Sequence, residues 1–221
     1  SMTEARDFHE YGFGPLGTVT VKTEAHPESL LQTTGYTGFG GLYQDGRTIN
    51  KPGELWDRLL QLPTDEQRPA PVLIGELAFH GLKDAGKDLH RLVTVLSVKE
   101  RTMPAVLEAL ASGHAYAVGE GDHHVQLRLD EFRVLCQGGA RSASMGDRLD
   151  PVGARDLMVR LSISAADHGR HPVKVRLIRS GQVVAQLAGE TPFLVDWPDR
   201  TMPTTERMTY RVEITGSGEL L

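Results

Sequence analysis

The chain has 221 residues, a formal net charge of −5 and a sequence pI near 6.0. Apolar residues make up 39% of it and charged residues 24%, which is the composition of a soluble globular protein with one large domain or two ordinary ones. The acidic balance gives no reason to expect nucleic acid or an anionic membrane as a partner. No apolar run reaches the roughly 20 residues that span a bilayer and no signal peptide is visible, so we expect a cytoplasmic protein.

The first half of the chain has α/β character. Residues 1–17 show no clean period and are expected to be irregular. Runs of β-branched and apolar residues predict three strands, Thr18–Thr23, Pro71–Leu77 and Leu92–Val98. Apolar residues at helical spacing after a proline predict two helices, Gly53–Leu62 and Pro104–Ser112, with Gly113 as the C-cap of the second. The continuous apolar run Val72-Leu73-Ile74 is typical of a strand covered on both faces, as in a parallel sheet.

A glycine-rich segment, Thr33–Gly46, lies between the first predicted strand and the first predicted helix. It contains no phosphate-binding motif, so no nucleotide cofactor is expected. Its aromatic residues Tyr36, Phe39 and Tyr43 have two interpretations, either a lid that binds substrate over a pocket or a loop whose rings pack on the domain.

From Ala115 onward the apolar period changes to two. About seven short alternating runs, separated by turns with Gly, Asp and Pro, predict an antiparallel β-sandwich. The late run Tyr210-Arg211-Val212-Glu213 is expected to carry an inward valine and outward charges. The single cysteine, Cys136, excludes an internal disulfide, and its strand-like surroundings predict a buried, inert thiol.

The order of several segments resembles the PHP family (polymerase and histidinol phosphatase) of metal-dependent phosphoesterases. The segments are RTMPAVLEALASGHAYAV, MGDRL, VKVRLIRSGQVVAQ and TYRVEI, preceded by ELWDRLL and PVLIGELAFHG. The resemblance spans roughly residues 50–216 and is strongest after residue 100. It implies part of a PHP barrel in residues 18–115, followed by an immunoglobulin-like sandwich in residues 116–221. The N-terminal half of the barrel is expected to be missing.

The chain departs from the family pattern at the metal ligands. It has no His-x-His pair, and Ala78 stands where the family's last barrel strand has an aspartate before His80. Four residues remain as candidate ligands of a single Zn, Mn or Fe ion, namely Glu24, His26, Glu76 and His80, with His90 a poorer fifth. Glu24 and His26 share one side of a strand end, whereas Glu76 and His80 follow the buried strand at its carboxyl end. The alternatives are a solvated Glu24, a packed His26, a loop-capping His80 and a Glu76 paired with a nearby Lys or Arg.

Two functions from different classes follow. The first is a degenerate or partial metal-dependent hydrolase, in which the ion would bind a phosphate oxygen and acidify a water. As this chain alone, it is expected to be weakly active or inactive. The second is a non-catalytic binding or assembly module, because the open sheet of a half-barrel invites a partner. That partner would be a second copy of the chain or the missing barrel half.

Overall fold

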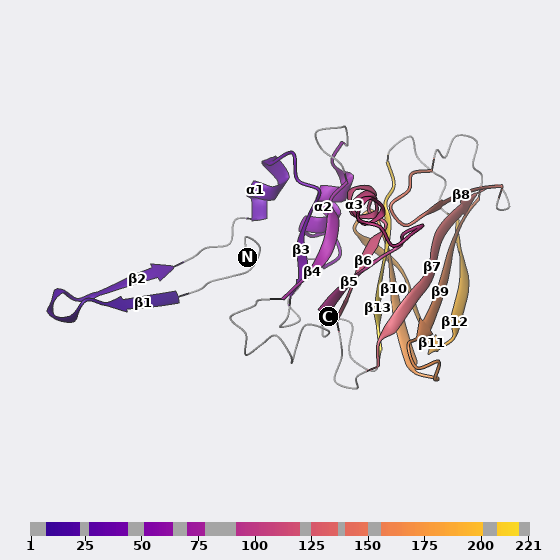
Figure 1. Ribbon diagram of the computed structural model, residues 1–221. Helices are drawn as coiled ribbons and strands as arrows, with labels where there is room; N and C mark the ends of the chain where they lie inside the picture. Colours follow the sequence, from indigo (N-terminus) through magenta and orange to yellow (C-terminus); the bar gives the residue numbers. More distant parts are fainter. Residues whose placement is uncertain are drawn as a thin grey trace.

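The computed structural model describes residues 8–22, 27–43, 51–63, 70–77, 92–119, 125–136, 140–149, 156–200 and 207–216 (Figure 1). Most of these residues lie in strands, which form two larger antiparallel sheets and three separate strand pairs. The described part of the chain contains no helix long and apolar enough to cross a membrane.

The C-terminal half folds into two antiparallel sheets that share one core (Figure 1). The four-stranded sheet has the order β12-β9-β7-β8, with the bounds Phe193–Asp199, Leu157–Ala165, Leu127–Cys136 and Arg141–Ser144. The three-stranded sheet has the order β11-β10-β13, with the bounds Gln182–Glu190, Pro172–Arg179 and Tyr210–Thr215. The predicted β-rich, antiparallel architecture of this half is confirmed.

The core between the two sheets follows directly from the period-two pattern. Alternate residues of β9 and β10 point inward and are at most 1% exposed, namely Val159, Leu161, Ile163, Val173, Val175 and Leu177. Smaller apolar contributions come from every other strand of the two sheets except β8. Cys136 is 1% exposed at the end of β7, in agreement with the predicted buried thiol.

Strand β7 is one continuous strand although its apolar pattern changes along its length. Its inward residues change from odd to even positions, from Leu127 and Leu129 to Phe132 and Val134. The pairing with β9 shifts between Leu129 and Glu131, which marks a β-bulge. The bulge adds Asp130 as an extra residue, and this is why odd-numbered residues face the core before it and even-numbered residues after it. The strand therefore continues without a turn.

The first half contains a parallel β-α-β unit. Strand β3 (Gly38–Tyr43) pairs in parallel with β4 (Val72–Glu76), and α2 (Leu55–Gln61) lies between them in the chain. Leu55 and Leu59 of α2 are buried against the short helix α1 (Pro27–Gln32) and the start of β3. Strand β3 lies in the segment expected to be a loop, since its glycines hide the strand pattern.

Strand β5 (Leu92–Leu96), helix α3 (Met103–Ser112) and strand β6 (Ala115–Gly119) follow in the chain. Helix α3 begins after the N-cap Thr102, and Gly113 ends it in the left-handed conformation (φ +80°), as predicted. Strand β6 starts at the predicted boundary of the two modules, and it pairs with β5 in an antiparallel manner. The β5–β6 pair lies beside β4, where the Gly75 N–H donates to Thr94 Oγ1 at 3.0 Å.

A hairpin projects from the N-terminal side of the molecule (Figure 1). Its strands β1 (Phe8–Gly12) and β2 (Thr18–Lys22) are antiparallel and are joined through a 3-10 turn, Gly14–Leu16. Residues 8–12 were expected to be irregular, and they form β1 because β2 supplies their hydrogen-bonding partners. Strand β2 agrees with the predicted run Thr18–Thr23.

Candidate functional site

The carboxyl edge of the β3–β4 pair holds the candidate site. The parallel register places Tyr43, the last residue of β3, opposite Glu76, the last residue of β4. The carboxyl ends of parallel strands meet at one edge of a sheet, which is where α/β proteins collect their functional groups. A predicted substrate-binding residue and a predicted metal ligand therefore lie side by side in the backbone.

The carboxylate of Glu76 is exposed and its position depends on a glycine. It lies over Gly40 of β3, where a Cβ would collide with the carboxylate oxygen Oε2. Among the residues that the structure describes, Glu76 forms no ion pair with a Lys or Arg, which was the alternative considered for it.

The other three predicted metal ligands, Glu24, His26 and His80, lie outside the described residues, as does His90. Within the described ranges, no group of three or more His, Cys, Asp or Glu side chains is arranged to hold a metal ion. The four-ligand set therefore stays a prediction, with Glu76 as its one described member.

The predicted substrate-binding aromatics take two different positions. Tyr36 and Phe39 pack against the buried leucines of α2, and the Tyr36 hydroxyl donates to the Leu30 carbonyl at 2.9 Å. For Tyr36 and Phe39, these contacts fit the interpretation in which the rings pack on the domain. Tyr43 alone lies at the β4 edge beside Glu76, and substrate binding by the three residues stays a prediction.

A buried ionic network joins α2 to the three-stranded sheet. The Arg211 guanidinium of β13 donates to both carboxylate oxygens of Asp57 at 2.6 and 2.7 Å, and it also pairs with Glu213. Glu213 in turn accepts from Arg176 of β10. The side chains of Arg211 and Asp57 are only 5% and 1% exposed. The charges of β13 lie on the face away from the sandwich core, where Val212 packs, as expected, but Arg211 is buried there because α2 covers it.

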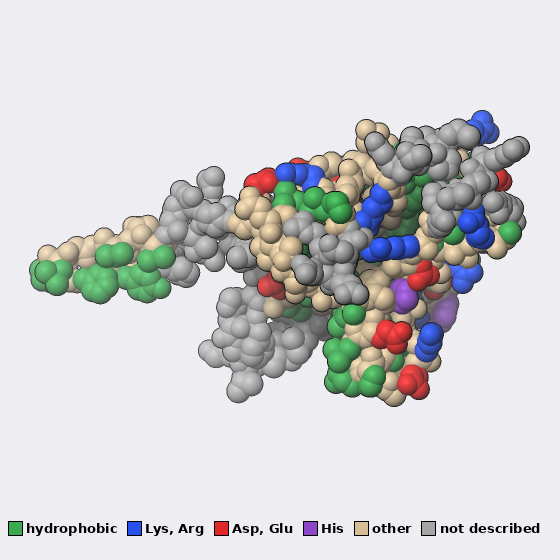
Figure 2. Space-filling model, turned by 90° about the horizontal axis from the view of Figure 1, so that it is seen from above, with side chains coloured by type: hydrophobic (Ala, Val, Ile, Leu, Met, Phe, Trp, Pro, Cys, Tyr) green, Lys and Arg blue, Asp and Glu red, His purple; other side chains and the backbone are tan. Residues whose placement is uncertain are grey.

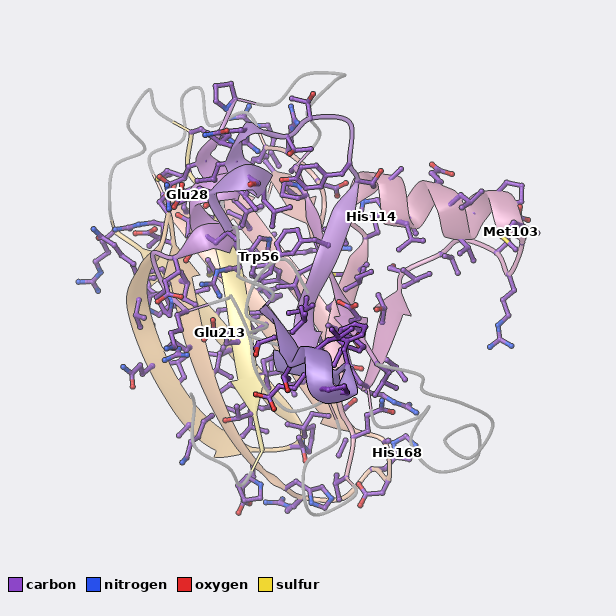
Figure 3. All side chains as sticks on the ribbon, turned by 90° about the vertical axis from the view of Figure 1, so that its left-hand side faces the viewer. Glu28, Trp56, Met103, His114, His168 and Glu213 are labelled. Carbon is purple, nitrogen blue, oxygen red and sulfur yellow. The ribbon has the colours of Figure 1, made fainter. Side chains whose placement is uncertain are left out.

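The hydrogen bonds and one further contact fix the charge of Arg211 in place. Burial opposes the charged form, but the hydrogen bonds to Asp57 and Glu213 outweigh it and raise the pKa of Arg211. The guanidinium also lies 5.1 Å from the ring centroid of Trp56, a cation–π contact. Figure 3 labels Trp56 and Glu213 on the α2 side and the β13 side of this junction. Sequence reasoning missed the network, since its partners are 154 residues apart.

A second polar cluster lies at the end of the sandwich core. Asp199 accepts from the Tyr210 hydroxyl at 2.6 Å and from Arg179 at 2.7 Å, and its side chain is 1% exposed. Burial, together with the hydrogen bond to Asp199, raises the pKa of Tyr210 far above the ordinary tyrosine value. The cluster therefore holds the Tyr210 hydroxyl against the Arg179–Asp199 ion pair.

Ser112, His114 and Asp147 form a hydrogen-bonded chain at the C-terminal end of α3, opposite Met103 in Figure 3. The Ser112 hydroxyl donates to the Glu108 carbonyl at 2.7 Å, so its proton is engaged by the helix. His114 Nδ1 lies 3.2 Å from the Ser112 hydroxyl oxygen, and Nε2 lies 3.0 Å from the Asp147 carboxylate. A nucleophilic serine gives its proton to the imidazole, whereas the shorter hydrogen bond of Ser112 goes to the Glu108 carbonyl. The three residues brace α3 against the β8 turn.

The turn His168–His171 carries two histidines, of which His171 is paired with a carboxylate. His171 Nε2 lies 2.8 Å from an oxygen of Asp167, and Asp167 also accepts from the Gly169 N–H at 2.9 Å. The Gly169 hydrogen bond and the contact with His171 lower the pKa of the Asp167 carboxyl. These contacts shape the turn between β9 and β10.

Comparison of the chain with protein-family models, with curated proteins and with solved structures gives no match. The resemblance to the PHP family therefore stays a prediction from the sequence.

Proposed function

We propose that the chain is a partial PHP-type metal-dependent hydrolase with its site at the carboxyl edge of β3–β4. The observation that carries the proposal is the parallel β-α-β unit, which brings Glu76 to that edge with an exposed carboxylate. The half-barrel expected from the sequence would be built on this unit. The antiparallel sandwich after it agrees with the order of segments in the family, and its immunoglobulin-like character belongs to the same proposal.

The donor chemistry at this edge fits a divalent ion. Glu76 supplies a carboxylate without an ion-pair partner among the described residues, and the proposed partners Glu24, His26 and His80 add oxygen and imidazole donors. Three or four such ligands are the usual complement of a Zn site. A bound ion would supply Lewis-acid chemistry toward a phosphoester, while Tyr43 at the same edge would contact the substrate.

The test is the metal content of the purified chain by inductively coupled plasma mass spectrometry. We expect near-stoichiometric Zn, Mn or Fe in the wild type, and loss of the ion in Glu76→Gln and His80→Ala. Glu108→Gln is the matched control, since Glu108 is an exposed carboxylate on the surface of α3. The proposal fails if the wild type takes up no metal after incubation with these ions, or if Glu108→Gln loses as much metal as Glu76→Gln.

A second candidate function is the non-catalytic assembly module. The observation that favours it is a hairpin, β1–β2, which carries large exposed apolar side chains away from the rest of the molecule (Figure 2).

A further inference from the structure

The β1–β2 hairpin has one apolar side and one polar side. The register pairs Tyr11 with Val19 and Glu10 with Thr20. Because side chains alternate along a strand, Tyr11, Val19 and Val21 share one side, whereas Glu10 and Thr20 share the other. Phe13 and Leu16 extend the apolar surface at the turn, and Figure 2 shows hydrophobic side chains along one side of this arm.

The apolar hairpin face consists of five large side chains that are mostly in solvent. Their exposed fractions are 52% for Tyr11, 56% for Phe13, 90% for Leu16, 52% for Val19 and 46% for Val21. None of them belongs to a core cluster of the described residues. An isolated two-stranded hairpin is marginally stable in water, so a face of this kind gains stability when another surface covers it.

The size of the face fits a second copy of itself. With aromatic side chains of about 200 Å² each and smaller aliphatic ones, the exposed part of the five residues amounts to roughly 500 Å². Two such faces packed together bury about 1,000 Å², which is the lower limit for a specific protein–protein interface.

The chemistry and the shape of the arm point to the same occupant. The five described side chains of the face are uncharged, and the register also places His9 opposite Val21 on this side. An isologous contact needs a surface that can pack on its own copy, and an uncharged apolar side of a strand pair can do so. The arm projects from the body of the molecule, so two arms can overlap while the two bodies stay apart (Figure 1).

We propose that two copies of the chain dimerise by packing their apolar hairpin faces against each other. The dimer forms a small two-layer structure from four strands, with the polar sides of both hairpins in solvent. Because the interface is at the lower limit of size, the dissociation constant is on the order of micromolar. The dimer does not depend on metal binding, so Glu76→Gln dimerises like the wild type.

Sedimentation equilibrium of the full chain between about 1 and 100 μM tests this dimer, and the charge variants Val19→Glu and Thr20→Glu locate its interface. Val19 and Thr20 are neighbours in β2 on opposite sides of the hairpin, so both variants add the same charge to the same strand. We expect Val19→Glu to raise the dissociation constant at least about a hundredfold, since it places an unpaired charge in the contact. Thr20→Glu changes it by less than about threefold, because its side stays in solvent. A wild type that is monomeric throughout, or equal effects of the two variants, overturns the proposal.

Cysteine cross-linking supplies a readout that does not need the charge variants to fold. Cys136 is 1% exposed, so a cysteine introduced on the hairpin is the reactive thiol of the folded chain. A short bis-maleimide should join Val19→Cys into a covalent dimer and leave Thr20→Cys largely monomeric. Equal cross-linking of both sides counts against the interface.

A lipid surface is the competing occupant, and flotation with neutral phosphatidylcholine vesicles separates the two. The second-copy proposal predicts that the wild type stays with the soluble fraction. Flotation of the wild type that Val19→Glu abolishes, together with a monomer in solution, would assign the face to lipid and overturn the dimer.

Discussion

Arg211 shows at the scale of one residue how a charge can be buried in this protein. Its guanidinium is 5% exposed and is matched by two carboxylates and the face of Trp56. The charged groups of the network pair with one another, so the desolvation of the Arg211 charge is offset only while its carboxylate partners are present. Such a network fixes the position of α2 on the three-stranded sheet.

Arg211→Ala is therefore expected to destabilise the chain by about 3–5 kcal/mol, because Asp57 would remain buried and charged without its partner. Urea denaturation followed by tryptophan fluorescence measures the free energy of unfolding. The control is Arg160→Ala, which breaks the exposed pair with Asp196 on the outer face of the sandwich, and which we expect to leave that free energy unchanged within error. Equal losses in the two variants would show that burial of the Asp57–Arg211 pair has no special energetic role.

At the scale of elements, the turn between β10 and β11 touches the start of α2. Ser180 and Gly181 both have positive φ, the geometry of a tight hairpin turn. A Cβ at Gly181 would lie 3.1 Å from Gly53 Cα and 3.3 Å from Asp57 Cβ. The approach of the two backbones thus depends on glycine, and it positions Asp57 for its contact with Arg211.

Gly181→Ala tests this approach, and Gly35→Ala is its matched control. Both glycines have φ +82°, but a Cβ at Gly35 would meet nothing within 4 Å. Both variants incur the backbone penalty of about 1–2 kcal/mol for a left-handed alanine. Gly181→Ala should lose more than that in urea denaturation, because the turn must move away from α2. An equal loss in the two variants would mean that the close contact contributes nothing.

At the scale of the whole molecule, burial is concentrated in the sandwich. The inward residues of β9 and β10 are at most 1% exposed, whereas the apolar residues of the β1–β2 hairpin are close to half exposed or more. The free energy of local opening follows the amount of packed surface. Stability is therefore expected to fall from the sandwich toward the hairpin.

Hydrogen exchange followed by mass spectrometry measures this gradient. At a concentration where the chain is monomeric, amides of β9 and β10 should be protected at least about a hundredfold more than those of β1 and β2. The Arg211→Ala variant provides a comparison, since it should lower protection in α2 before it affects β9. Protection of β1 and β2 equal to that of β9 in the monomer would contradict the gradient.

Much of the architecture could be predicted from the sequence because the interactions that decide it are local or periodic. The alternation of β9 and β10 predicted the sandwich, and helical spacing with a left-handed Gly113 predicted α3 and its end. For the same reason Glu76 was predicted at the carboxyl end of a buried strand. The metal site to which it was assigned stays a prediction, since its other members lie outside the described residues.

The tertiary structure decided what depends on contacts between distant segments. Strand β3 is a strand because β4 pairs with it, and its glycines give room to the Glu76 side chain. Strand β7 is continuous because its pairing with β9 admits a bulge at Asp130. Arg211 is buried because Asp57, 154 residues earlier, faces it from α2. The sequence by itself determined which residues seek a core, through periods that each strand or helix carries alone. Only the fold determined which charges are covered, because that depends on what lies opposite them in space. For the same reason, only the fold determined that the apolar side of the β1–β2 hairpin stays in solvent.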